Sequence, residues 1–193
     1  CALPIYLFMQ KGFHKTTIDE IVTQANVAKG TFYLYFKDKS DVMQDIVIRI
    51  SRKVLLDAYE DIKALSDVCF ADRIVHFVDN IIEYFKRNSL VLRMIERNFS
   101  WPMLQEELMG CTENDRALSA MLDDFFSQPE LQGVPRDDIF KALYVIVSMC
   151  GTVCYSSILH GQPDTIDNMK PTLYRIIRLA VAPDGTGGKA ALS

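Results

Sequence analysis

The sequence predicts an all-α protein, in which an N-terminal three-helix head with a helix-turn-helix is joined by a long helix to a C-terminal helical-bundle body. Apolar residues recur three and four positions apart along most of the chain, and strand-like alternation never extends beyond four residues. Hydrophobic residues make up 49% of the 193, which is enough for a buried core. We expect a head over residues 1–50, a body over 51–182 and a disordered, glycine-rich tail over 183–193.

The first two helices of the head have clear start and stop signals. Proline is tolerated only in the first helical turn, so the first helix is expected from about Pro4 to Lys11. Thr17 and Glu20 form the S/T-x-x-E pattern of a capping box, which predicts the start of the second helix. Asn26 tolerates a left-handed backbone and would end that helix sharply.

A further short helix is expected from about Ala28 to Phe36, after Val27 returns to the core. Phe32 and Phe36 are four apart and would anchor this helix inward. Its other positions carry small, hydroxyl-bearing and cationic residues, which suit contacts with DNA phosphates and base edges. Two short helices joined by a tight turn form a helix-turn-helix, whose second helix usually lies in the major groove.

The head resembles the N-terminal signature of the tetracycline-repressor (TetR) family of bacterial transcription regulators, over about residues 2–50. The resemblance has no gap and is carried by Leu7-Phe8, Gly12-Phe13, Thr16-Thr17, Ile21, Ala25, Val27, Lys29-Gly30-Thr31, Tyr33, Tyr35-Phe36 and Lys39. The sequence departs from the family pattern at Asn26, where glycine is usual, and at Pro4. Ala28 replaces the usual serine, and the lost side-chain cap costs about 1 kcal/mol.

The resemblance implies a DNA-binding transcriptional regulator, in particular a repressor that binds a palindromic operator as a homodimer and is released by a small effector. It assigns the contacts with double-stranded DNA to Thr17, Lys29, Gly30, Thr31, Tyr33, Tyr35 and Lys39. Thr17 would hold a phosphate at the N-terminus of its helix, where free N–H groups favour anions. Residues 54–182 would form the effector-binding and dimerisation body.

The body is expected to be helical throughout. Ser40 would cap a rigid helix reaching about Ala64, which links the head to the body. Further helices are expected at 68–87, 89–98, 102–109, 112–128 and 135–160, the last with Pro135 as its first residue. A final helix would reach about Ala182 and be kinked or split at Pro171.

The segment Ala142–Leu159 contains 18 residues and no charge. A helix that is apolar on all sides can be buried between its own core and a partner subunit. We therefore expect dimerisation through this helix and the last one, which carries Leu173, Ile176, Ile177 and Ala180. A transmembrane span is the alternative, disfavoured by the minimal length, the Ser, Thr and Gly content and the lack of flanking basic clusters.

Aromatic and methionine side chains in the body are candidates for the walls of an effector pocket, although the same stripe is typical of an ordinary core. The candidate set is Phe77, Ile81, Tyr84, Phe85, Met94, Phe99, Trp101, Met103, Met121, Phe125, Tyr144, Met149 and Tyr155. Such walls suit a mainly apolar ligand. The alternative is a ligand-independent DNA-binding or adaptor protein whose helical body only dimerises.

Charge and motif content disfavour an enzyme and predict no cofactor or metal. Residues 1–53 carry eight Lys/Arg against five Asp/Glu, a net of +3, whereas residues 54–193 carry 13 against 20, a net of −7. A basic head on an acidic body suits local DNA binding. No phosphate loop, zinc motif or nucleophile elbow occurs in the sequence.

The histidines and cysteines also fit a structural role. His76 falls on the polar face of its helix, and Cys150 and Cys154 are expected to be buried thiols rather than a metal or redox pair. Five scattered cysteines argue against a disulfide framework, so we expect a reducing, cytoplasmic location. The chain begins at Cys1 and not at Met, which leaves room for preceding residues, and no segment of it resembles a signal peptide.

Overall fold

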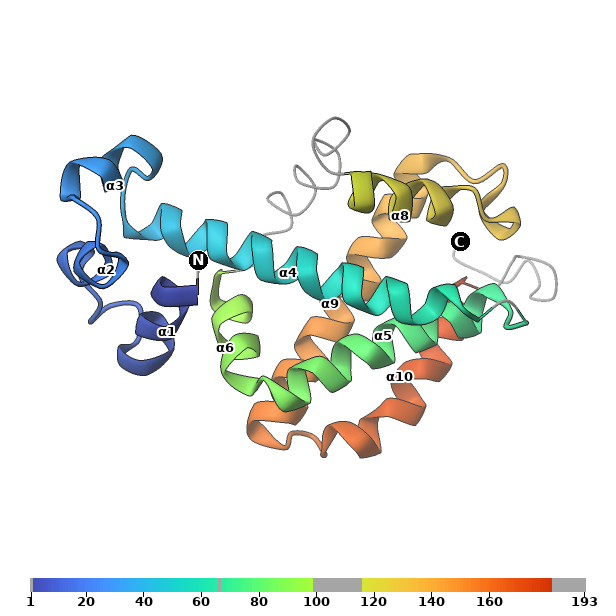
Figure 1. Cartoon of the computed structure of the whole chain (residues 1–193). Helices are drawn as coiled ribbons and strands as arrows, with labels where there is room; N and C mark the ends of the chain where they lie inside the picture. The colour runs from blue at the N-terminus through green and yellow to red at the C-terminus, as the bar shows by residue number, and fades with distance from the viewer. Residues whose placement is uncertain (1, 66, 99–115, 182–193) are drawn as a thin grey trace, which may run out of the picture.

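The computed structural model describes residues 2–65, 67–98 and 116–181, and within these ranges the fold is helical with no strand, as predicted (Figure 1). In chain order the α-helices are α1 (Ala2–Lys11), α2 (Ile18–Ala25), α3 (Lys29–Tyr35), α4 (Lys39–Lys63), α5 (Phe70–Arg87), α6 (Ser89–Asn98), α8 (Arg116–Phe126), α9 (Arg136–His160) and α10 (Ile166–Val181). A 3-10 turn, Pro129–Leu131, lies between α8 and α9.

The head consists of α1, α2 and α3, gathered at one end of α4 (Figure 1). Its core joins apolar side chains from these helices and from α6: Leu7, Phe8, Ile21, Val22, Phe32, Val42, Met43, Ile46, Val47, Val91, Met94 and Ile95. Helix α6 contacts both α1 and α4, so the core of the head continues into the body. A shift of α4 or α6 would therefore move side chains that belong to the core of the head.

Helix α4 is the long connection between head and body. It begins at Lys39 and is capped by Asp38, not by the expected Ser40, because the Asp38 carboxylate accepts hydrogen bonds from the amides of Ser40 (2.7 Å) and Asp41 (3.0 Å). At about 1.5 Å per residue, its 25 residues extend over roughly 37 Å. The half within the body contacts α5 and α8.

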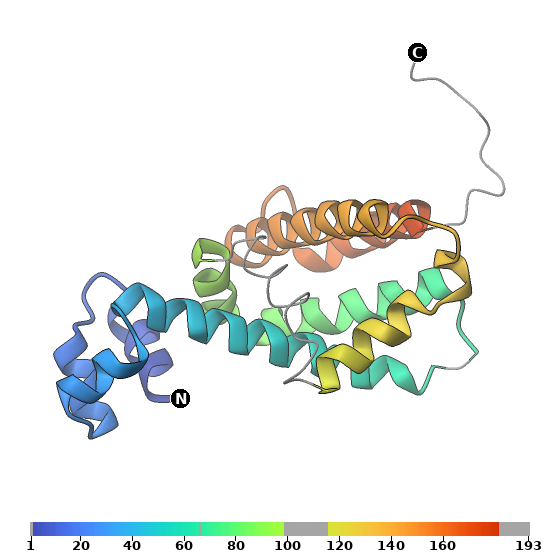
Figure 2. The same cartoon turned by 90° about the horizontal axis from the view of Figure 1, so that it is seen from above.

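The body has two layers of helices. Figure 2 shows α9 and α10 side by side on one face, with α4, α5 and α8 on the other. One apolar cluster joins α5 to α9 and α10 through residues such as Ile82, Cys154 and Ile177. A second cluster, Tyr59, Ile62, Leu118 and Met121, joins α4 to α8.

Ion pairs reinforce the contact between α5 and α10. Lys170 on α10 binds Asp79 at 2.6 Å and Glu83 at 2.5 Å, and its side chain is only 16% exposed. The Tyr174 hydroxyl also donates a hydrogen bond to Asp79. Because Lys170 is mostly desolvated, removing either its charge or its partners would leave an uncompensated charge in the interface.

Helix α9 is long and apolar enough to cross a membrane by length and composition alone, with a mean hydropathy of 1.8 over a stretch that is 17% buried. In the structure one side of α9 packs on α5, α6 and α10. The other side exposes Tyr144 (47%) and Val145 (60%), among Ser148 and Gly151.

Several local predictions about element ends were wrong. Val27 is 43% exposed instead of returning to the core, and its amide closes the turn on the carbonyl of Val22. Pro135 precedes α9 as its N-cap instead of being its first residue. Pro171 lies inside α10, which is not split and runs unbroken from Ile166 to Val181.

Other predictions hold or fall outside the described residues. His76 is exposed, and Cys154 is buried, as expected for a solvated histidine and a core thiol. Burial raises the pKa of the Cys150 thiol to about 11 and that of Cys154 to about 12, so both are unreactive. The helix expected at 102–109 and the tail at 183–193 lie outside the described ranges.

Candidate nucleic-acid interface

Helix α3 presents one side to the head core and the other to solvent. Phe32 is buried and Phe36 half-buried, with ring centroids 5.7 Å apart, so they anchor the helix as predicted. On the outer side Tyr33, Leu34 and Tyr35 are 52%, 80% and 76% exposed. Three large, consecutive exposed side chains on a short helix are unusual for a surface that stays in water.

Gly30 lies near the start of α3, where a Cβ would meet no atom within 4 Å. Packing inside the head therefore does not require glycine here, and its backbone is not in the left-handed region. The missing side chain leaves the α3 backbone open to close approach from outside. Thr31 beside it is also exposed.

The N-terminus of α2 carries the predicted capping box. The amide of Glu20 donates to Thr17 Oγ1 at 3.2 Å, and the amide of Thr17 donates to Glu20 Oε2 at 2.9 Å. Lys11 binds the other carboxylate oxygen of Glu20 at 2.6 Å. The Lys11 hydrogen bond, followed by that from Thr17, lowers the pKa of Glu20 to about 2, so the box stays ionised. The first-turn amides of Ile18 and Asp19 have no intrahelical partner and can face an anion.

Lys29 connects α3 to α2. Its Nζ lies 2.7 Å from Oδ1 of Asp19, and both side chains are exposed. This hydrogen bond raises the pKa of Lys29. A solvent-exposed pair of this kind contributes little to stability, so Lys29 is free to exchange its carboxylate for a phosphate.

Lys39 is placed differently from the other candidates. Its ammonium donates hydrogen bonds to the carbonyls of Phe13 (2.6 Å), Thr16 (2.8 Å) and, more weakly, His14 (3.4 Å). It also lies 4.5 Å from the centroid of the Phe13 ring. The three N–H donors of this lysine are thus directed at the loop between α1 and α2.

The structure brings six of the seven predicted DNA-binding residues onto one exposed surface built by α3 and the N-terminus of α2: Thr17, Lys29, Gly30, Thr31, Tyr33 and Tyr35. Sequence reasoning missed Leu34, the most exposed large apolar side chain of the head. Helical spacing in the sequence could have indicated this exposure. Leu34 is two positions from both inward anchors, Phe32 and Phe36, and therefore faces away from the core.

The described members of the predicted ligand-lining set are distributed over several core clusters and the surface. Met94 and Met121 are buried in core clusters, and Phe77, Ile81, Phe85 and Met149 are half-buried, three of them packed against those clusters. Phe125 packs on Phe70 and Phe126, Tyr155 lies against His160, and Tyr144 is on the surface. Phe99, Trp101 and Met103 lie outside the described residues.

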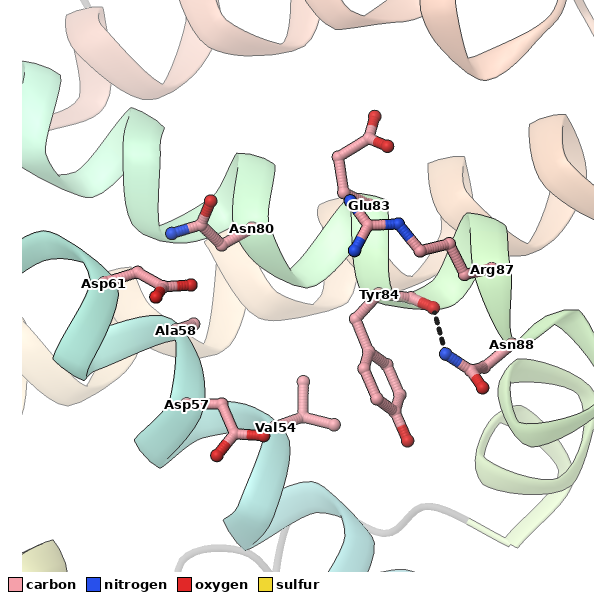
Figure 3. A pocket seen from close by; sticks show the side chains of 9 residues that line it. All are labelled: Val54, Asp57, Ala58, Asp61, Asn80, Glu83, Tyr84, Arg87 and Asn88. Atoms are coloured by element: carbon pink, nitrogen blue, oxygen red, sulfur yellow. Dashed lines mark hydrogen bonds between the residues drawn. The ribbon is translucent and has the colours of Figure 1, made fainter.

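A pocket of about 280 Å³ does lie between α4 and α5 (Figure 3). Its lining is Val54, Asp57, Ala58, Asp61, Asn80, Glu83, Tyr84, Arg87 and Asn88. Tyr84 is therefore the one predicted ligand residue in this lining, which is polar and not the apolar wall that was expected. Its charged residues are Asp57 and Asp61 on α4 and Glu83 and Arg87 on α5.

The sequence of the head is similar to sequences of known transcriptional regulators. Residues 5–46 match the family model described as "Bacterial regulatory proteins, tetR family". The Bacillus subtilis (strain 168) regulator YhgD, an uncharacterized HTH-type transcriptional regulator, is 28% identical over 91 residues, which is 47% of each chain. The Transposon Tn10 TetC protein of Escherichia coli is 30% identical over 103 residues, 52% of this chain and 51% of that protein. The chain thus spans about half the length of these curated relatives.

Solved structures share the fold over nearly the whole chain. A putative TetR-family regulator from Syntrophomonas wolfei superposes with a TM-score of 0.64 at 20% identity, covering 96% of this chain and 95% of that one. FadR from Bacillus subtilis gives a TM-score of 0.62 at 17% identity, covering 93% and 96%. The helix-turn-helix head thus has the sequence pattern of the tetR family of bacterial regulatory proteins, and the chain as a whole shares the fold of these solved structures.

Proposed function

We propose that the protein is a repressor that binds a palindromic operator as a homodimer and is released from it by a small, mainly apolar ligand. The observation that supports DNA recognition best is the outer side of α3, where Tyr33, Leu34 and Tyr35 are exposed while Phe32 holds the helix in the core. A rigid helix with exposed hydroxyl and apolar groups suits contacts with base edges in the major groove.

Base and phosphate contacts would be divided between the two helices of the motif. Thr31, Tyr33, Leu34 and Tyr35 would face the bases and the groove walls. Thr17, at the start of α2, and Lys29 would bind phosphates, which fix the register but carry no sequence information.

A homodimer would cover the apolar surface of α9 and α10. Val145 is 60% exposed on α9, and Ile176 and Leu179 on α10 are 41% and 73% exposed. Apolar side chains of this size on neighbouring helices are typical of a protein–protein interface. A two-fold axis there would set the two recognition helices about one DNA turn apart, ~34–36 Å, or a multiple of that.

Two similar proteins suggest which class of ligand to test. The Fatty acid metabolism regulator protein of Bacillus subtilis (strain 168) is 34% identical over 59 residues, which is 31% of this chain and 30% of that protein. The similar FadR structure contains stearoyl-CoA. Acyl thioesters are therefore the first apolar ligands to test. A ligand in the body would act through α4, which carries the head, and ligand and DNA would weaken each other's binding reciprocally.

The test is a gel shift of palindromic duplexes, with and without fatty acyl-CoA and other apolar compounds, beside sedimentation of the free protein. We expect a dimer that binds one palindrome and is displaced by a ligand. Operator binding that no ligand relieves would favour the alternative, a ligand-independent DNA-binding or adaptor protein. We infer a non-enzymatic, cytoplasmic protein, since the related proteins named above are transcriptional regulators.

A further inference from the structure

The pocket between α4 and α5 has an apolar floor and polar ends. Val54 and Ala58, which are 4% and 3% exposed, come from α4, and the half-buried Tyr84 comes from α5. Asn80 and Asn88 add amides. The Asn88 side chain donates a hydrogen bond to the Tyr84 carbonyl at 2.8 Å, drawn in Figure 3, which leaves its own carbonyl oxygen unused by this contact.

Two of the four charged residues of the lining are already neutralised. Asp57 is paired with Lys53 at 2.5 Å, within α4. Glu83 accepts from Lys170 at 2.5 Å, so its charge is taken up by the contact with α10. Neither carboxylate offers a full negative charge to a ligand.

The other two, Asp61 and Arg87, have opposite signs. Within the ranges that the structure describes, neither side chain has an ion-pair or hydrogen-bond partner. Ionised groups at the mouth of a pocket that are not paired with each other can each bind a charged group of a ligand, because charge-assisted hydrogen bonds are the stronger ones.

The two charged side chains start from opposite ends of the pocket. Helix α4 leaves the head and α5 returns toward it, so the two helices run antiparallel (Figure 1). In Figure 3, Asp61 lies beside Asn80 at one end of the pocket, whereas Arg87 starts next to Asn88 at the other end and its guanidinium reaches back along α5 to lie beside Glu83. Arg87 follows Asn80 by seven positions along α5, which corresponds to about 10 Å of helix between their backbones.

We propose that this pocket binds a small dipolar molecule with an ammonium group at one end and a carboxylate at the other, joined by an apolar spacer. Asp61 binds the ammonium, Arg87 binds the carboxylate through its two-pronged guanidinium, and the spacer lies on Val54, Ala58 and Tyr84. Binding itself is independent of the proposed function. Its transmission to the operator through α4 rests on that function.

The experiment is calorimetric titration of the full chain with ω-amino acids of increasing chain length, with octylamine and octanoate as single-charge controls. We expect saturable binding with an optimum at one chain length and much weaker binding of both controls. Asp61→Asn and Arg87→Gln should each weaken binding of the optimal compound by about tenfold or more. Glu60→Gln on α4 and Arg93→Gln on α6, which lie outside the lining, should leave it unchanged.

Three results would overturn the proposal: no binding of any chain length at millimolar concentration, equal affinity for the single-charge controls, or affinity unchanged in both pocket variants. Operator binding by the ligand-free protein is measured in parallel. If it fails while the ω-amino acids bind, the proposed DNA function is wrong and the pocket assignment stands. If operator binds and no ω-amino acid does, only the pocket assignment is lost.

Discussion

Lys39 and Phe13 contact each other twice. The Lys39 ammonium donates a 2.6 Å hydrogen bond to the Phe13 carbonyl and lies 4.5 Å from the centroid of the same residue's ring. With a further bond to the Thr16 carbonyl at 2.8 Å, the lysine ties the start of α4 to the loop that precedes α2. The Thr17 cap, which we propose as a phosphate contact, is next to that loop. Lys39 is thus placed to position the proposed DNA-binding surface from inside the head.

The first prediction separates positioning from direct phosphate contact. Lys39→Met keeps the apolar stem over Phe13 but leaves the carbonyls of Phe13, His14 and Thr16 without this donor, so we expect the free energy of unfolding to fall by about 1–3 kcal/mol. Operator affinity should weaken, while the slope of log affinity against log salt concentration stays unchanged. A lysine that binds phosphate directly would instead lower that slope by about one unit.

Lys37→Met is the matched control, since Lys37 is exposed and lies two residues earlier, in the loop before α4. It should leave thermal unfolding unchanged. A Lys39→Met protein with unaltered stability and a reduced salt slope would show that the lysine leaves its carbonyl partners and binds the DNA backbone.

The second prediction concerns Gly30. Because a Cβ at this position meets nothing within 4 Å, Gly30→Ala should leave the head folded and raise its stability by up to about 1 kcal/mol through the higher helix propensity of alanine. The methyl group would stand between α3 and DNA, so operator affinity should fall by about tenfold. Urea unfolding and gel shifts on the same protein measure the two effects, and an unchanged operator affinity would show that DNA does not approach the backbone here.

The third prediction assigns Leu34 to a thymine methyl group in the operator. Leu34 is 80% exposed, so Leu34→Ala should change the free energy of unfolding by less than about 0.5 kcal/mol. It should relax specificity at one base pair of each half-site by about 1–3 kcal/mol. Replacing each operator thymine in turn by uracil, which lacks the methyl group, checks this directly. One of these replacements should weaken operator binding by the original protein and leave operator binding by Leu34→Ala unchanged.

Local signals in the sequence predicted the local parts of the site. The Thr17–Glu20 capping box and the left-handed Asn26 depend on residues within a few positions of each other, and both were correct. The Lys39 contacts were not predictable in this way, because the carbonyls lie 23 and 26 residues earlier in the chain. Likewise, Asp61 and Arg87 face one pocket only because α4 and α5 fold back on each other. The residue types alone reveal neither the contacts of Lys39 nor the pocket that Asp61 and Arg87 share.

The fourth prediction is a pH dependence of the head. The pKa of Glu20 is about 2 in the folded protein, below its ordinary value of 4.5, because Lys11 and the Thr17 amide favour the carboxylate. A lowered pKa contributes stability that is complete above about pH 4.5 and is lost as the pH falls toward 2. Urea unfolding should therefore show a pH-dependent loss over this range that is smaller in Glu20→Gln.

Glu60→Gln serves as the control for Glu20→Gln, since it removes an exposed carboxylate of α4 that pairs with Lys63. Its unfolding should follow the original pH profile. A carboxyl titration of Glu20 observed by NMR near 4.5 would mean that the contact with Lys11 does not persist in solution.

The last prediction tests the dimer surface of α9 and α10. Val145→Glu or Leu179→Glu places a charge where we propose that a partner subunit lies. Both side chains are mostly exposed in the single chain, at 60% and 73%, so each variant should keep its helical circular dichroism. In a dimer the same charge would be buried without a partner, which costs several kcal/mol. Sedimentation should therefore show a dimer for the original protein and a monomer for both variants. Leu34→Glu, an exposed leucine changed in the same way in the head, should remain dimeric while losing operator binding. Dimers that persist in both α9 and α10 variants would move the interface to another face of the body.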